Sequence, residues 1–111
     1  MSYNIRFLPR FEKDIKRLSK KYPSLKSDFA DLIKTLQETP QTGTPLGNNC
    51  YKIRLAISSS GKGKRGGARV ITHVLIDANT VYLLTIYTKN EAETISDKEL
   101  EELLNQIKPN N

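Results

Sequence analysis

Three stretches in the second half of the chain alternate apolar and polar residues with a period of two. They cover residues 51–58, 69–76 and 80–89, and turn-forming residues separate them. Successive side chains of a strand point to opposite faces, so this period predicts strands with one apolar and one polar face. We expect a three-strand antiparallel meander, and we expect its most apolar stretch, residues 80–89, to be a central strand of the sheet.

Helical patterns flank this meander. Residues 9–21 repeat apolar side chains at helical spacing after a proline that suits the first turn, and Pro23 ends the pattern. Ser24 can cap a second helix, which continues to about Leu36. Residues 96–99 (SDKE) form a capping box ahead of a C-terminal helix.

The predicted fold is a single α+β domain, residues 1–111, in which an antiparallel sheet packs against an N-terminal helical hairpin and a C-terminal helix. Residues 2–7 alternate weakly and suggest a short strand. Residues 39–49 hold two prolines, two glycines and two asparagines and suggest a loop. We expect the helices on one face of the sheet and the opposite face open.

Positive charge is concentrated in one part of the chain. The formal net charge is +6, and residues 49–73 contain six basic residues and no acidic one. The remainder carries twelve basic and twelve acidic residues and is neutral. Such a local patch is typical of a surface that binds nucleic acid, and the simpler alternative is a solvated strand surface.

Composition also restricts the setting of the protein. One cysteine, Cys50, permits no internal disulfide, no run of about 18 apolar residues could span a bilayer, and residues 1–10 lack the apolar stretch of a signal peptide. We therefore expect a cytoplasmic protein with no membrane partner, in which Cys50 is a small buried residue.

The alternation assigns each strand side chain to a face. It places Leu84 and Ile86 under the helices. The other face then presents a polar set: Lys52, Arg54, Arg69, His73, Thr85, Tyr87 and Lys89. One histidine and one cysteine make no metal-ligand cluster, and no nucleophilic triad is evident, so we expect no metal and no cofactor. Metal-free cleavage of RNA remains, in which the 2′-hydroxyl is the nucleophile and cations stabilise the transition state.

Residue chemistry divides the roles on this face. Arg54 and Arg69 suit charge stabilisation, because a guanidinium binds two phosphate oxygens and does not deprotonate. Lys89, Tyr87 or His73 could move a proton, and crowded cations would favour neutral Lys89 and ionised Tyr87. Each residue also has a simpler interpretation as an ordinary strand or surface residue, above all the histidine.

The loop between the first two predicted strands carries a second basic group. Lys62, Lys64 and Arg65 alternate with glycines there. We expect them to bind backbone phosphates without taking part in chemistry, and we include His73 in this phosphate-binding set, whereas Lys52 belongs with Arg54, Arg69, Tyr87 and Lys89 in the catalytic set.

Four segments together resemble the RelE/ParE superfamily of type II toxin–antitoxin toxins. They are KKYPSLKSDFADLI (20–33), LGNNCYKIRLAI (46–57), GGARVITHV (66–74) and LLTIYTKNE (83–91). The resemblance implies a microbial ribonuclease-like toxin fold and a cognate antitoxin protein as partner. For RelE-like members it also implies metal-free cleavage of mRNA on the ribosome through the 2′-hydroxyl.

The resemblance also assigns site residues. Lys52 and Arg54 match the basic residues of the first strand motif, Arg69 matches a phosphate and transition-state ligand, and Lys89 matches the lysine that ends the last strand. RelE-like enzymes often carry a tyrosine several residues later, and residues 90–96 contain none. Tyr87 is the nearest substitute, so the general base stays open. A ParE-like poison of DNA gyrase and a nucleic-acid-binding corepressor without catalysis remain alternatives.

Overall fold

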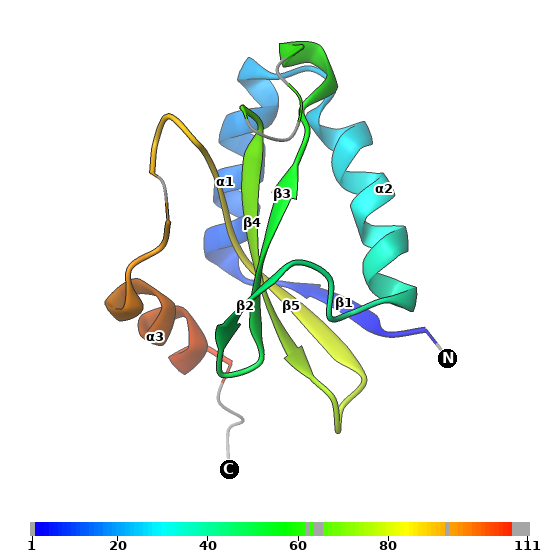
Figure 1. Ribbon diagram of the computed structural model, residues 1–111, viewed down its shortest axis with the longest axis vertical. Helices are drawn as coiled ribbons and strands as arrows, with labels where there is room; N and C mark the ends of the chain where they lie inside the picture. The colour runs from blue at the N-terminus through cyan, green and yellow to red at the C-terminus, as the bar shows by residue number, and fades with distance from the viewer. Residues whose placement is uncertain (1, 62, 64–65, 93, 108–111) are drawn as a thin grey trace.

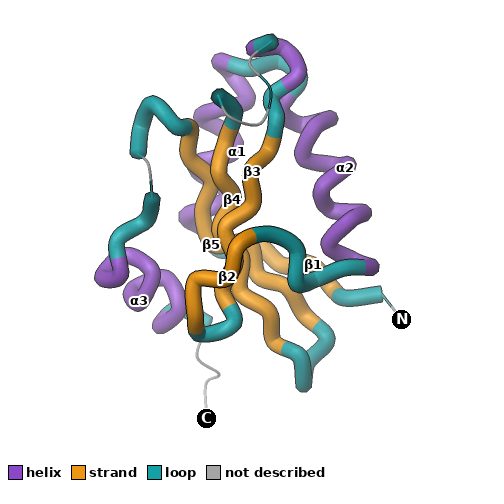
Figure 2. The backbone as a smooth tube through the Cα atoms, in the orientation of Figure 1, coloured by secondary structure: helices purple, strands orange, loops and turns teal. Residues whose placement is uncertain are grey.

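The computed structural model describes residues 2–61, 63, 66–92 and 94–107. Five strands form one sheet in the order β1-β5-β4-β3-β2. In Figures 1 and 2, α1 lies behind the strands and α2 lies to their right, with the two helices joined at the top of the view, whereas α3 lies at the lower left, near β2. The fold class is α+β, as predicted. Within the described residues, no helix combines the length and apolar character needed to cross a membrane.

The helices follow their sequence signals closely. They are α1 (Pro9–Lys21), α2 (Leu25–Glu38) and α3 (Asp97–Asn105). The Ser96 hydroxyl accepts the Glu99 amide at 3.1 Å, as a capping serine should. Ser24 precedes α2 but does not cap it, because its hydroxyl donates to Asp28 Oδ2 at 2.8 Å instead.

The sheet is larger than the predicted meander, and it is mixed. The strands are β1 (Asn4–Phe7), β2 (Thr44–Gly47), β3 (Cys50–Leu55), β4 (Ala68–Leu75) and β5 (Thr80–Thr88). β1 pairs with β5 in parallel, and the other neighbours are antiparallel. β4 is therefore the middle strand of the five. The most apolar stretch, β5, is an interior strand between β1 and β4 rather than the middle one.

The segment predicted as a loop, residues 39–49, contains strand β2. Asn48 and Asn49 have φ values of 53° and 59°, so they adopt the left-handed conformation. Two such residues form the tight turn that joins adjacent antiparallel strands, and asparagine tolerates this conformation well. The turn signals therefore marked a hairpin between β2 and β3.

Helices cover both faces of the sheet, so the expectation of one open face was wrong. A first core cluster, which includes Phe11, Leu36 and Val70, lies between the sheet and the α1–α2 hairpin. On the opposite face, Leu100 and Leu103 of α3 pack in a second cluster. That cluster includes strand residues Ile71, Leu84 and Tyr87. α3 covers this face because Ile71, Leu84 and Tyr87 make it apolar, although the sequence pattern predicted a polar face.

A β-bulge explains why Leu84 lies in the second cluster. Ile71 pairs with Thr85, but the next residue of β4, Thr72, pairs with Leu83. Leu84 is thus an extra residue on β5, and the alternation changes phase there. Beyond the bulge, Ile86 stays on the face of the helical hairpin as predicted.

Candidate functional site

Three predicted site residues form a row across the sheet. Arg54 on β3 lies directly opposite Arg69 on β4, and Arg69 lies directly opposite Tyr87 on β5. Opposite residues of antiparallel strands share a face, with Cβ atoms about 5 Å apart. Like charges in this position are destabilising by a few tenths of a kcal/mol to about 1 kcal/mol. A sheet that retains two adjacent arginines is suited to receive an anion.

Two lysines approach the same end of this face. Lys52 lies two residues before Arg54, on the same side of β3, opposite Ile71. Lys89 directly follows β5, and its amide donates to the carbonyl oxygen of Gly67 at 3.3 Å. Together with the row, they form what we call the cation site: Lys52, Arg54, Arg69, Tyr87 and Lys89.

Gly67 permits the close approach of backbone at this site. A Cβ atom on Gly67 would lie 2.1 Å from the carbonyl oxygen of Leu55 on β3. Any side chain would therefore push apart the ends of β3 and β4. The glycine keeps Arg69 and the amide of Lys89 within one continuous piece of sheet.

The members of the cation site differ in exposure. Arg69 is only 6% exposed, and its Nη1 donates to the Ala68 carbonyl oxygen at 3.3 Å. Lys52 is half-buried, whereas Arg54 and Lys89 are exposed. A buried guanidinium has few alternative positions, so Arg69 is the fixed charge of the cation site.

Tyr87 is neutral at this site. Its hydroxyl oxygen is buried, and no described residue makes a hydrogen bond of ordinary geometry with it. Burial raises the pKa of Tyr87, and the opposing influence of the Arg69 charge and of nearby groups on Thr94 and Ile95 does not outweigh it. The expectation that crowded cations would favour ionised Tyr87 was therefore wrong, because burial is the larger effect.

His73 lies away from the arginine row. It is opposite Cys50 and Tyr82, near the other ends of these strands. Its Nδ1 lies 3.4 Å from Cys50 Sγ, and burial lowers the pKa of His73. Cys50 is buried, as predicted, and burial raises the pKa of its thiol to about 11. The two neutral groups form a hydrogen bond whose direction depends on the histidine tautomer.

Thr85 lies opposite Ile71 on the same face as Tyr87, as the alternation predicts, but it does not join the cation site. Its side chain is buried, and its hydroxyl donates to Asp14 Oδ2 on α1 at 2.6 Å. The segment of β5 beyond β1 has no strand beside it on that edge, and α1 lies there instead. The loop cations Lys62, Lys64 and Arg65 lie outside the described residues.

Sequence reasoning missed a set of ion pairs near the cation site. Arg10 and Arg17 flank the buried Asp14 on α1, at 3.1 and 3.7 Å. Arg17 also contacts Glu91 at 2.6 Å, and Arg10 contacts Glu99 at 3.6 Å. The spacing of three and four residues on α1 is a signal for the helical pairs, but the pairs with Glu91 and Glu99 depend on tertiary structure.

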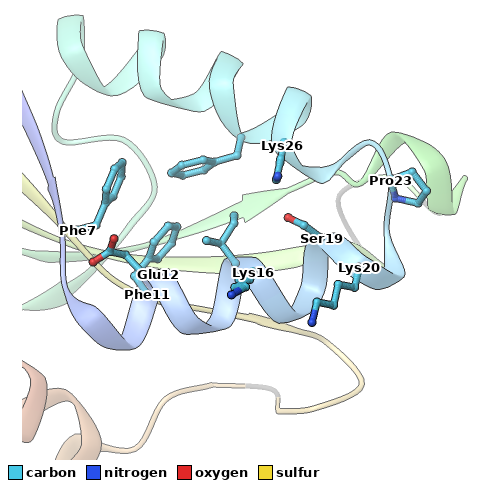
Figure 3. Close-up of a pocket in the computed structure, with 10 residues that line it drawn as sticks. Phe7, Phe11, Glu12, Lys16, Ser19, Lys20, Pro23 and Lys26 are labelled. Atoms are coloured by element: carbon cyan, nitrogen blue, oxygen red, sulfur yellow. The ribbon is translucent and has the colours of Figure 1, made fainter.

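A second surface lies on the other side of the molecule. A groove with a volume of about 740 Å³ lies there. Figure 3 shows its lining residues between α1 and α2. Phe7, Phe11 and Phe29 form its apolar wall, with ring centroids 5.1 to 6.0 Å apart. Its polar lining is largely basic: Lys16, Lys20 and Lys26, with Glu12 and Ser19. We call this surface the aromatic groove.

The cation site can bind a phosphate and offset negative charge. Its side chains supply donors from three strands, and its neutral tyrosine can give a proton. In the part of the chain that the structure describes, no three histidine, cysteine or acidic side chains are arranged to hold a metal ion. The chemistry that these residues supply is therefore that of cations and a phenol.

Solved structures of RelE toxins share this fold. An arginine-to-alanine double mutant of Escherichia coli toxin RelE in the free state matches with a TM-score of 0.65 and 18% identity, over 96% of this chain and 99% of that chain. The RelBE2 toxin–antitoxin complex from Mycobacterium tuberculosis matches with a TM-score of 0.58 and 18% identity, over 79% of this chain and 99% of that chain. At these identities the likeness concerns the fold.

The sequence itself matches a family model over residues 11–108. This range includes α1 from Phe11 onward and all of α2, β2 to β5 and α3. The model describes the RelE toxin of the RelE/RelB toxin–antitoxin system. The chain therefore belongs to the RelE toxin family.

Proposed function

We propose that this protein is the toxin of a type II toxin–antitoxin system and cleaves mRNA on the ribosome, without a metal, through the RNA 2′-hydroxyl. The observation that carries the proposal is the row of Arg54, Arg69 and Tyr87 across three strands, with Lys52 and Lys89 at the same end. An RNA brings its own nucleophile. The protein has to hold the phosphate, stabilise added charge and move protons.

The geometry suggests a role for each side chain. Arg69 is fixed by burial and is suited to bind the scissile phosphate. Lys52, Arg54 and Lys89 can offset the charge that develops on the phosphate oxygens. Neutral Tyr87 can donate a proton to the departing 5′-oxygen once bound RNA uncovers its buried hydroxyl. No side chain of the site is assigned as the base, so the proton of the 2′-hydroxyl passes to solvent water. His73 has no role in this proposal.

Macromolecular partners follow from the proposed role. The toxins of the matching family act in a system with an antitoxin, and M. tuberculosis RelBE2 was solved as a toxin–antitoxin complex. We infer a cognate antitoxin for this chain. The ribosome and its bound mRNA are the proposed target, and we expect Lys62, Lys64 and Arg65 to contact backbone phosphates there.

The test is to map mRNA 5′ ends after brief expression of the wild type, Arg69→Ala and Arg6→Ala. Arg6 is an exposed arginine on β1 and serves as the matched control. We expect new 5′ ends within coding regions for the wild type and for Arg6→Ala. For Arg69→Ala we expect roughly a hundredfold fewer, the magnitude for loss of one preorganised donor.

Two outcomes would contradict the proposal. Intact mRNA with a DNA-damage response would identify a gyrase poison of the ParE type. Salt-sensitive binding of nucleic acid with neither cleavage nor growth arrest would identify a binding module without catalysis.

A further inference from the structure

Basic and acidic side chains alternate along one side of α1 and form ion pairs with α3 and with the turn that follows β5. Asp14 is at the centre, 3.1 Å from Arg10 Nε and 3.7 Å from Arg17 Nη2. Arg10 continues to Glu99 on α3, at 3.6 Å. Arg17 continues to Glu91 at 2.6 Å, in the turn that follows β5. The ion pairs of Arg17 with Asp14 and with Glu91 thus connect α1 to the end of β5.

Glu91 stabilises this turn by accepting hydrogen bonds from Thr88, within the turn itself. Its Oε1 accepts the Thr88 amide at 2.9 Å and the Thr88 hydroxyl at 3.3 Å, while Oε2 receives Arg17. The Glu91 amide returns to the Thr88 carbonyl oxygen at 3.0 Å. Partial burial would raise the pKa of Glu91, but the Thr88 amide and Arg17 outweigh it and lower the pKa. The carboxylate is therefore ionised at neutral pH.

Lys89 lies in this turn, between Thr88 and Glu91. Its amide is held by the Gly67 carbonyl oxygen on one side, and the Thr88 and Glu91 contacts hold its neighbours on the other. Its side chain is exposed. The ammonium group therefore depends on this short backbone segment for its position relative to Arg69.

We propose that Glu91 and Arg17 are positioning residues that hold Lys89 in place at the cation site. This inference rests on the proposed function. An exposed ion pair contributes little to global stability. Reacting groups, in contrast, are sensitive to displacement, and an error of about 1 Å can cost a hundredfold in rate. The pair should therefore affect catalysis more than folding.

The first test measures mRNA cleavage on programmed ribosomes for Glu91→Gln, Arg17→Met and a control, Glu102→Gln. Glu102 is an exposed acid on α3. We expect kcat to fall about tenfold in both Glu91→Gln and Arg17→Met, with KM changed less than twofold, because RNA binding does not require the exact position of Lys89. The control should retain wild-type kcat. Wild-type kcat in both test variants would overturn the inference.

The second test asks whether Glu91 acts through Lys89. In a Lys89→Ala background, Glu91→Gln should cause no further loss of kcat, because the positioned group is already gone. A further tenfold loss in that background would show that Glu91 acts by another route, and would overturn the positioning role.

A third measurement separates this inference from the proposed function. Hydrogen exchange at the Lys89 amide reports its bond to Gly67 directly. We expect exchange about tenfold faster in Glu91→Gln than in the wild type or Glu102→Gln. Unchanged exchange would overturn the inference. Absence of mRNA cleavage by the wild type would refute the proposed function, and the exchange result would still decide whether Glu91 holds Lys89.

Discussion

The aromatic groove and the cation site lie on opposite faces of the sheet and are built in different ways. The groove forms between α1 and α2, and part of its wall, Phe11, is 1% exposed and belongs to the core. The cation site draws on three strands, and Arg54 and Lys89 are exposed. The groove therefore depends on residues that also stabilise the fold. The exposed members of the cation site can be altered at little cost in stability.

The largest effect that this difference predicts is the loss of stability in Phe11→Ala. Removal of a buried phenylalanine costs about 3–5 kcal/mol. Phe7→Ala is the matched variant on the same wall, and Phe7 is 43% exposed. We expect that variant to lose about 1–2 kcal/mol, in proportion to the area that it buries. Urea unfolding measures both values, and equal losses would show that the groove wall is separate from the core.

Unlike Phe11→Ala, which should lower stability, Tyr87→Phe should lower the rate of mRNA cleavage and leave stability nearly unchanged. The hydroxyl is buried without an ordinary hydrogen bond in the described residues, so its removal should change the free energy of unfolding by less than about 1 kcal/mol. Loss of the proposed proton donor should lower kcat for mRNA cleavage by about a hundredfold. An unchanged kcat would show that Tyr87 takes no part in the reaction and that only Arg54 and Arg69 of the row do.

Neutralisation of the loop should separate binding from chemistry within the basic region itself. In the triple variant Lys62→Ala, Lys64→Ala and Arg65→Ala, we expect about tenfold weaker binding to ribosome–mRNA complexes and an unchanged kcat. The slope of log affinity against log salt should fall by about 2, since each lost phosphate contact contributes about 0.7 on single strands. A lower kcat at saturation would mean that the loop takes part in the reaction.

The smallest predicted effect concerns Asp28, which links α2 to the start of this loop. Its carboxylate accepts bonds from the Ser24 hydroxyl at 2.8 Å and from the Ser58 amide at 2.9 Å. Partial burial would raise the pKa of Asp28, but the bonds from Ser58 and Ser24 outweigh it and lower the pKa. Stabilisation by a depressed pKa is present above the unfolded value, near pH 4, and is lost as pH falls through the folded value.

Asp28→Asn should therefore be less stable than the wild type at pH 7, by less than about 1 kcal/mol because Asp28 is only partly buried and water screens its charge. The difference should shrink as the pH falls below about 4. Urea unfolding at a series of pH values measures it. A difference that stays constant with pH would point to packing rather than to the charge.

Local patterns in the sequence determined most of the elements. The proline at the start of α1, the capping serine of α3 and the period-two strands predicted their places, because caps and side-chain periods are properties of short segments. The same alternation placed Arg54, Arg69 and Tyr87 on one face, and their register pairs them directly.

Tertiary structure decided what depends on distant segments. The bulge at Leu84 ended the simple alternation on β5, and the approach of α1 placed Asp14 against the Thr85 hydroxyl. The side of the sheet that α3 covers, the burial of Tyr87 that raises its pKa, and the contact of Arg17 with Glu91 all join residues far apart along the chain. The sequence by itself determined which side chains carry the charge. Only the packed sheet decided which of them meet, because register and burial exist only once the segments are brought together.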